Sequence, residues 1–235
     1  LGALCRRRRF ELMSLVSCQY SLLSTMLALW RPTGSVGYGE LETLLRAADE
    51  LSGWPGECAA FCIHMFAWTG VRKNELCAAH REDLSVDTWT FKVRHPKGEG
   101  TYGRQRIVPI PDRLKPVVIR YLKARDEMLA GRGEMEVVPL VPSVRNPERS
   151  ITRGAIDKWV WDVSEKSGVQ FNPHALRRTY GQILIDNGVS VETVSVMLGH
   201  SFTTTTEKHY CRKTADSARL EVIRAWRVLR SIPAD

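Results

Sequence analysis

Two arginines in this sequence are suited to chemistry on a phosphate group. Arg72 lies in the stretch TGVRKNEL, and Arg177 ends the stretch HALR. An arginine keeps its charge at any physiological pH, and its planar guanidinium matches two oxygens of a phosphate. A pair of arginines can therefore bind both non-bridging oxygens of a phosphodiester, in the role that a divalent metal ion often has. Either arginine alone would be interpreted as a surface residue.

Two histidines can act on the same phosphate. His174 precedes Arg177 by three residues, so their side chains share one face if the segment is helical. An imidazole titrates near neutral pH, and His174 can accept a proton or hydrogen-bond to the phosphate. His200 follows Gly199 at a predicted helix end, where one ring nitrogen can donate to the phosphate while a neighbour holds the other. A lone histidine is more often a core or capping residue, but here the spacing favours function.

Three further side chains extend this set. Lys97 lies in the turn-rich stretch 95–103, and an ammonium near several arginines has a lowered pKa, which makes it a better proton donor. Lys92 is a nearby alternative. The phenol of Tyr210, with an ordinary pKa of about 10, needs a base or a cationic field before it can react. Glu75 lies one helical turn after Arg72 and can orient it by a salt bridge, unless it is simply an exposed helix glutamate.

In this order, TGVRKNEL, PKG, HALR and LGH followed by Tyr210 resemble the catalytic domain of the tyrosine recombinase (phage integrase) family over about residues 38–230. The resemblance implies that Tyr210 attacks DNA and forms a 3′-phosphotyrosyl link. It implies that Lys97 reaches the minor groove and protonates the departing 5′ oxygen, with neither metal nor ATP. The implied catalytic residues are Arg72, Lys97, His174, Arg177, His200 and Tyr210, with Glu75 in support.

The resemblance also implies partners and a class of reaction. The expected function is site-specific recombination of double-stranded DNA, of the integration, excision or resolution type. The last predicted helix carries an apolar stripe, which in this family commonly docks on a neighbouring protomer; packing on its own domain is the alternative. The stripe consists of Leu220, Ile223, Trp226 and Leu229. We therefore expect a homo-oligomer on DNA, a dimer or tetramer joined through this helix.

Two other functions remain as alternatives. A type IB topoisomerase shares the phosphotyrosyl chemistry, but that family has a lysine- or arginine-type pattern before its second arginine, where this chain has His174. A non-catalytic DNA-binding or regulatory protein on the same fold is expected to have lost the nucleophile or an arginine, yet this chain retains the whole set.

Composition agrees with a packed domain that binds a polyanion. Hydrophobic residues make up 43% and charged residues 26% of 235 residues, which excludes disordered, collagen-like and polytopic membrane chains. The net charge of +8 favours nucleic acid as a partner. Six scattered cysteines in a chain of this size predict reduced thiols and an intracellular location, cytoplasmic and nucleoid-associated or wherever the target DNA lies. Cys58 and Cys62 could share a helix face as metal ligands, but no neighbouring residue completes a zinc spacing.

The elements that must position these residues are mainly helical. Two strands at 88–94 and 105–110 form a basic β-hairpin, so the fold class is mainly α with a small antiparallel sheet (α+β). Gly70 is expected in the left-handed position that ends a helix. The first helix is expected to stop at Trp54-Pro55-Gly56, and 137–146 is a connector. Helices are predicted at 38–51, 57–68, 72–78, 112–130, 152–167, 173–187, 190–198, 203–211 and 216–230.

The first 35 residues differ from the rest. Four arginines precede an apolar stretch at 12–30 that polar residues interrupt. We interpret 1–35 as an arm, or the remnant of the family's core-binding domain with its linker, and 36–235 as the catalytic domain. Membrane insertion is the weaker alternative, because a span needs about 20 predominantly apolar residues.

Side chains outside the predicted site have less specific interpretations. The tryptophans lie beside apolar helical runs and are assigned to the core: Trp54, Trp68, Trp159, Trp161 and Trp226. A set of basic residues could equally contact phosphates or lie in solvent: Arg94, Arg104, Arg106, Arg153 and Lys158.

Overall fold

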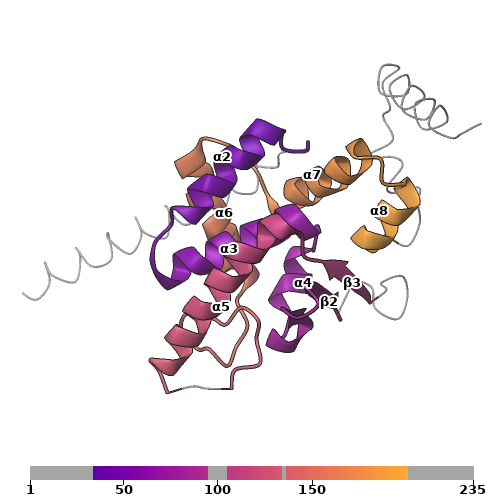
Figure 1. Ribbon diagram of the computed structural model, residues 1–235. Coiled ribbons are helices and arrows are strands. Elements are labelled where there is room, and N and C mark those ends of the chain that lie inside the picture. Colours follow the sequence, from indigo (N-terminus) through magenta and orange to yellow (C-terminus); the bar gives the residue numbers. More distant parts are fainter. Residues whose placement is uncertain (1–33, 95–104, 134–135, 201–235) are drawn as a thin grey trace, which may run out of the picture. The chain divides into compact units, whose positions relative to one another are not determined.

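The structure, a computed structural model, describes residues 34–94, 105–133 and 136–200. The chain divides into two units, Leu1–Gly34 and Ser35–Asp235. The described part is mostly helical with one small antiparallel sheet, which confirms the predicted fold class (Figure 1).

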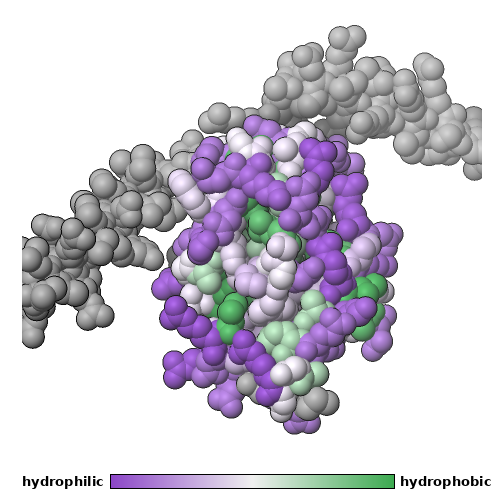
Figure 2. All heavy atoms as spheres, turned by 90° about the vertical axis from the view of Figure 1, so that its left-hand side faces the viewer, coloured by the Kyte–Doolittle hydropathy of each residue, from purple (hydrophilic) through white to green (hydrophobic). Residues whose placement is uncertain are grey.

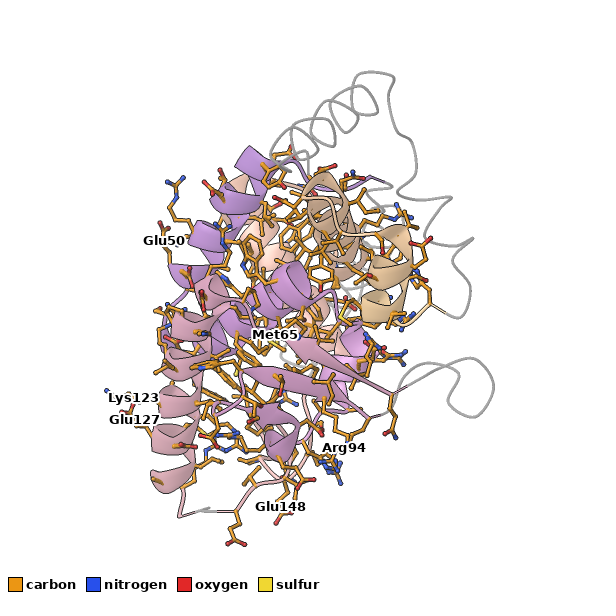
Figure 3. The ribbon with its side chains drawn as sticks, turned by 45° about the vertical axis from the view of Figure 1, so that its right-hand side comes forward. Glu50, Met65, Arg94, Lys123, Glu127 and Glu148 are labelled. Carbon is orange, nitrogen blue, oxygen red and sulfur yellow. The ribbon has the colours of Figure 1, made fainter. Side chains whose placement is uncertain are left out.

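Helix α3 (Gly53–Thr69) forms the centre of the domain, because its sequence GWPGECAAFCIHMFAWT is apolar around most of the helix. Helices of the second unit pack around it: α2 (Tyr38–Asp49), α5 (Lys115–Ala130), α6 (Arg153–Ser167) and α7 (Pro173–Asp186). The ring of Phe61 on α3 stacks on Tyr121 of α5 with 4.0 Å between centroids. Figure 3 shows Met65 of α3 in the interior, whereas Lys123 and Glu127 of α5 project outwards. The face in Figure 2 is mostly hydrophilic, as expected of a domain whose apolar side chains are inside.

The start of α3 corrects one prediction. The residues Trp54-Pro55-Gly56 do not stop the preceding helix, which already ends at Asp49, but lie in the first turn of α3. Proline is tolerated in a first turn, because the N–H that it lacks would have had no partner inside the helix. The proline-glycine pair was therefore a helix start rather than a helix stop.

The predicted hairpin is confirmed and gains a third strand. Strands β1 (Leu84–Ser85), β2 (Thr90–Val93) and β3 (Arg106–Pro109) pair antiparallel in the order β1-β2-β3. Phe91 lies opposite Val108, and both face the core; Lys92 lies on the other, exposed face. Strand β1 is only two residues long and was not predicted. Two short 3₁₀ helices, η1 (Arg81–Asp83) and η2 (Asp112–Leu114), flank the sheet in the chain.

Two short helices complete the domain, α4 (Lys73–Cys77) and α8 (Val191–Leu198). Both were predicted within one residue of their observed ends. Helix α8 packs on α7 and β3, and its Val194 and Leu198 form a small apolar cluster with Tyr180 of α7. The predicted helices at 203–211 and 216–230 lie outside the described residues. None of the helices that the structure describes is both long enough and apolar enough to cross a membrane.

Of the tryptophans assigned to the core, three are buried or pack on other side chains, and Trp161 is half-buried. Trp159 is buried, and Trp54 stacks on Tyr121 with 5.7 Å between ring centroids. The guanidinium of Arg113 covers Trp68 at 4.6 Å from the ring centroid. Trp226 lies outside the described residues.

Candidate active site

The turn after α3 brings Arg72 to the site. Gly70 ends the helix with φ +63°, which confirms the predicted left-handed position. A Cβ there would lie 2.4 Å from Cδ1 of Tyr180, so only glycine fits between the two helices. The chain then extends, and Arg72 occupies the N-cap position of α4. The short loop therefore holds Gly70 against α7, two residues before Arg72.

The carboxylate of Glu75 binds both the main chain and the side chain of Arg72. Oε2 of Glu75 accepts from the Arg72 backbone N–H at 2.8 Å, and Oε1 accepts from Nη1 of the guanidinium at 2.8 Å. The side chain of Glu75 is only 1% exposed, whereas that of Arg72 is 26% exposed. The interpretation of Glu75 as an exposed helix glutamate is therefore wrong, and the expected salt bridge is present.

A second arginine shares this carboxylate. Arg106 of β3 donates from Nη2 to Oε2 of Glu75 at 2.7 Å and from Nη1 to Oε1 at 3.1 Å. Its side chain is 5% exposed. Of the two alternatives for Arg106, the solvated surface position is wrong, and a phosphate contact stays a prediction. Burial alone would raise the pKa of Glu75, but hydrogen bonds and charges from Arg106 and Arg72 together hold it below the ordinary range, so the carboxylate is ionised.

Arg177 reaches the same place from α7. Asn172 caps this helix by accepting from the N–H of Ala175 at 2.8 Å, and Pro173 occupies its first position. The buried guanidinium of Arg177 donates to the carbonyls of Gly70 and Leu198. One arginine therefore joins the turn after α3 to the end of α8.

The end of α8 is where the two arginines meet. Nη2 of Arg72 donates to the carbonyl of Gly199 at 3.1 Å, next to the Leu198 carbonyl that Arg177 binds. Gly199 has φ +62°, and the N–H of His200 donates to the carbonyl of Ser195 at 3.0 Å, which closes a Schellman motif. His200 is half-buried immediately after this turn. The structure thus brings Arg72, Arg177 and His200 together around residues 198–200.

The remaining predicted residues differ in how far the structure describes them. His174 is exposed, at the second residue of α7 and one turn before Arg177. Lys97 and Tyr210 lie outside the described residues, so their roles stay predictions. Among the other basic residues, Arg94 pairs with Asp83 and Glu82 at the end of β2, where Figure 3 labels it, and Lys158 pairs with Asp162.

Sequence reasoning missed the role of Arg106, although a signal was present. Arg106 and Val108 are two residues apart on β3, so they point to the same face of the sheet. Because Val108 is apolar, this alternation placed Arg106 inside the domain. A buried arginine requires an acidic or carbonyl partner.

Residues 34–94, 105–133 and 136–200 contain no cluster of three or more histidine, cysteine or acidic side chains that could hold a metal ion. Cys58 and Cys62 are buried free thiols in α3, and burial raises the pKa of each. Neither thiol is therefore activated by its surroundings.

Comparison with known proteins assigns the family. The sequence pattern of the phage integrase family matches residues 38–217. The chain belongs to this family. A tyrosine recombinase XerA from Thermococcus kodakarensis is 29% identical over 161 residues, which cover 64% of this chain and 52% of the relative. A tyrosine recombinase XerD from Bifidobacterium longum is 30% identical over 151 residues, covering 59% of this chain and 44% of the relative. The chain spans about half the length of the curated relatives that it matches.

Solved structures of family members share the fold. The crystal structure of XerA recombinase superimposes with a TM-score of 0.65 at 23% identity, covering 83% of this chain and 65% of the other. The Tn1549 transposon integrase, solved in complex with a circular intermediate DNA, gives a TM-score of 0.63 at 21% identity, covering 83% and 66%. The described helices and sheet therefore have the tyrosine recombinase catalytic fold.

Proposed function

We propose that this chain carries the catalytic domain of a site-specific DNA recombinase that cleaves and rejoins strands through a 3′-phosphotyrosyl intermediate. Family membership supports the reaction class, and relatives of the same fold have been solved bound to DNA, including the Tn1549 integrase and XerH on its difH substrate. One observation carries the proposal for this chain. Arg72 donates to the carbonyl of Gly199, immediately before His200, and Arg177 donates to the adjacent carbonyl of Leu198. The two arginines are 105 positions apart in the sequence.

In the proposed reaction the guanidinium groups act on the scissile phosphate. Arg72 and Arg177 bind its non-bridging oxygens, whose negative charge grows as the phosphorus becomes five-coordinate. His200 donates a hydrogen bond to one of these oxygens. His174 accepts the phenol proton or bonds to the phosphate. These groups supply the positive charge, and the domain needs neither metal nor ATP.

Tyr210 and Lys97 perform the bond changes in this proposal. The phenolic oxygen of Tyr210 forms a bond to phosphorus while the bond from phosphorus to the 5′ oxygen breaks. The phenol proton passes to His174, and the departing 5′ oxygen takes a proton from Lys97. One phosphodiester replaces another, so the energy of the cleaved bond is kept. A 5′ hydroxyl from another strand then reverses the step and restores the DNA.

The proposal includes partners and further parts of the protein. The substrate is double-stranded DNA, in the nucleoid or wherever the target sequence lies. Residues 36–235 form the catalytic domain, with the last predicted helix at its end. That helix joins protomers into a dimer or tetramer on DNA. Deletion of 214–235 tests the last point, because protomers that still associate and exchange strands without these residues would refute it.

A suicide substrate tests the proposed reaction. A duplex nicked near the cleavage site loses a short fragment after cleavage, so the covalent protein–DNA adduct accumulates. The wild-type chain should form an SDS-resistant adduct in EDTA, and Tyr210→Phe should form none. An adduct that survives this substitution refutes Tyr210 as the nucleophile. Failure of the wild type to form any adduct, with DNA binding retained, would favour a regulatory protein; relaxation of supercoiled DNA lacking a recombination site would favour a topoisomerase.

The arginines are tested by comparing rate with binding. Arg72→Ala and Arg177→Ala should each lower the rate of adduct formation by about 10²–10³-fold, as expected for loss of a donor that stabilises developing charge. Binding should fall much less, because the contribution of each arginine grows in the transition state. Equal losses of binding and rate would contradict this role. Arg132→Ala is the matched control, since this exposed arginine donates to the carbonyl of Val144 in the connector region.

A further inference from the structure

The carboxylate of Glu75 is held by two arginines. It accepts four N–H groups, two from Arg72 and two from Arg106, with donor–acceptor distances of 2.7–3.1 Å. Each oxygen accepts two of them. A carboxylate offers about four acceptor sites, so Glu75 is saturated and has one orientation. Any displacement of Arg106 therefore changes the anchor that orients Arg72.

Arg106 also extends to the end of α8. Its Nε donates to the carbonyl of Met197 at 2.8 Å. Gly199 packs directly on its guanidinium, since a Cβ at Gly199 would lie 2.7 Å from Nη1 of Arg106. The same side chain thus contacts Glu75 of α4 and the turn that precedes His200. Its backbone pairs with Val93 of β2, at the base of the hairpin.

The charges show why a second arginine is useful here. The pair of Arg72 and Glu75 alone has no net charge, and a carboxylate beside a bound phosphate repels that phosphate. With Arg106 included, two guanidinium groups surround one carboxylate and the group has a net charge of +1. Arg106 is nearly inaccessible, whereas Arg72 is partly exposed. The excess positive charge is therefore available at Arg72, on the accessible side.

We propose that Arg106 is a positioning residue for the cleavage reaction, which orients Arg72 through Glu75 and offsets the carboxylate charge so that Arg72 can bind the phosphate. This inference rests on the proposed function. Arg106 does not touch DNA in this role, and its effect passes through Glu75 and the turn at Gly199. It also ties the β2–β3 hairpin, whose loop contains Lys97 in the sequence, to the place where Arg72 and Arg177 meet.

The first experiment compares two buried arginines. Arg106→Met should lower the rate of adduct formation on the order of a hundredfold, the loss typical of a misplaced catalytic group, while DNA binding changes by only a few fold. Arg125→Met is the matched control, since Arg125 is also buried and donates to the carbonyls of Val137, Pro139 and Leu140 in the connector. It should lose stability but keep the wild-type rate. Arg106→Lys restores the charge and should recover part of the rate.

The second experiment asks whether Arg106 acts through Glu75. In Glu75→Gln the carboxylate charge is gone, so removing Arg106 as well should cost little further rate. We expect Glu75→Gln and the double variant Glu75→Gln/Arg106→Met to cleave within about threefold of each other, a non-additivity typical of residues in one network. A second large loss in the double variant would overturn the proposal. This comparison stands even if Arg106→Met does not fold, because the double variant leaves no buried carboxylate unpaired.

A third measurement does not depend on catalysis. A carboxyl-carbon NMR titration reads the pKa of Glu75 directly, and it should rise in Arg106→Met because burial then acts against one arginine instead of two. An unchanged titration overturns the proposal. If the wild type forms no adduct, the proposed function fails, and the titration still decides whether Arg106 holds Glu75 ionised. If the wild type reacts and Arg106→Met reacts equally fast, only the positioning role fails.

Discussion

Gly199→Ala should damage both stability and catalysis for two separable reasons. The first is backbone strain: Gly199 has φ +62°, and a side chain in the left-handed region costs about 1–2 kcal/mol. The second is contact, because the new Cβ would meet Arg106 at 2.7 Å from Nη1 and 3.1 Å from Cζ. That guanidinium cannot simply swing away, since it bonds to Glu75 and Met197. Overpacking of this kind costs a further ~1–3 kcal/mol.

Gly168→Ala separates the two reasons. Gly168 also ends a helix in the left-handed region, with φ +71°, but an added Cβ there meets nothing within 4 Å. It should therefore show the strain alone, about 1–2 kcal/mol in urea unfolding, and the wild-type rate of adduct formation. Gly199→Ala should lose more stability and at least about tenfold in rate, since the carbonyl of Gly199 also binds Arg72. Equal stability losses with an unchanged rate in Gly199→Ala would refute the packing argument.

Three further predictions concern other parts of the domain. Glu75→Gln should destabilise the fold most above about pH 5. Because the arginines lower the pKa of Glu75, the stability that its carboxylate contributes is lost only as the pH falls through that lowered value. In pH-dependent urea unfolding, the wild type and Glu75→Gln should therefore converge in acid. Asn172→Ala removes the cap on the N–H of Ala175 and should cost about 1 kcal/mol in the same assay without abolishing cleavage. Burial raises the pKa of Cys77 to about 11 and raises that of Cys58 further, so mass spectrometry should find slow alkylation of Cys77 at pH 8 and none of Cys58 until the protein unfolds.

Elements with a local cause were predictable from the sequence. The alternation around Phe91 and Val108 predicted the hairpin, and a glycine after an apolar helix predicted the left-handed residue at Gly70. The start of α3 was not predictable, because a proline-glycine pair fits either the end of one helix or the first turn of the next. Strand β1 was missed because two residues show no periodicity. Both failures occur where short-range patterns are ambiguous.

The arrangement of the site was predictable only in part. The sequence order indicated that Arg72 and Glu75 pair, because they are one turn apart. It could not indicate that Arg106 shares the carboxylate, because Arg106 lies 31 positions from Glu75 and 91 from Met197. Contacts of that separation depend on how the sheet packs against α4 and α8. The burial of Arg106 could be read from its position beside Val108, but its partners could not.

The use of a carboxylate beside a proposed phosphate site follows from the geometry of arginine. A main-chain carbonyl binds one or two N–H groups of a guanidinium and leaves it free to rotate about that contact. The carboxylate of Glu75 instead accepts from the backbone and the side chain of Arg72 together, so it fixes both the start of α4 and the direction of the guanidinium. Its negative charge would weaken phosphate binding, and a second arginine buried behind it offsets that charge without competing for the substrate. On this argument the buried position of Arg106 is a requirement: an exposed cation would bind the phosphate itself and leave Glu75 uncompensated.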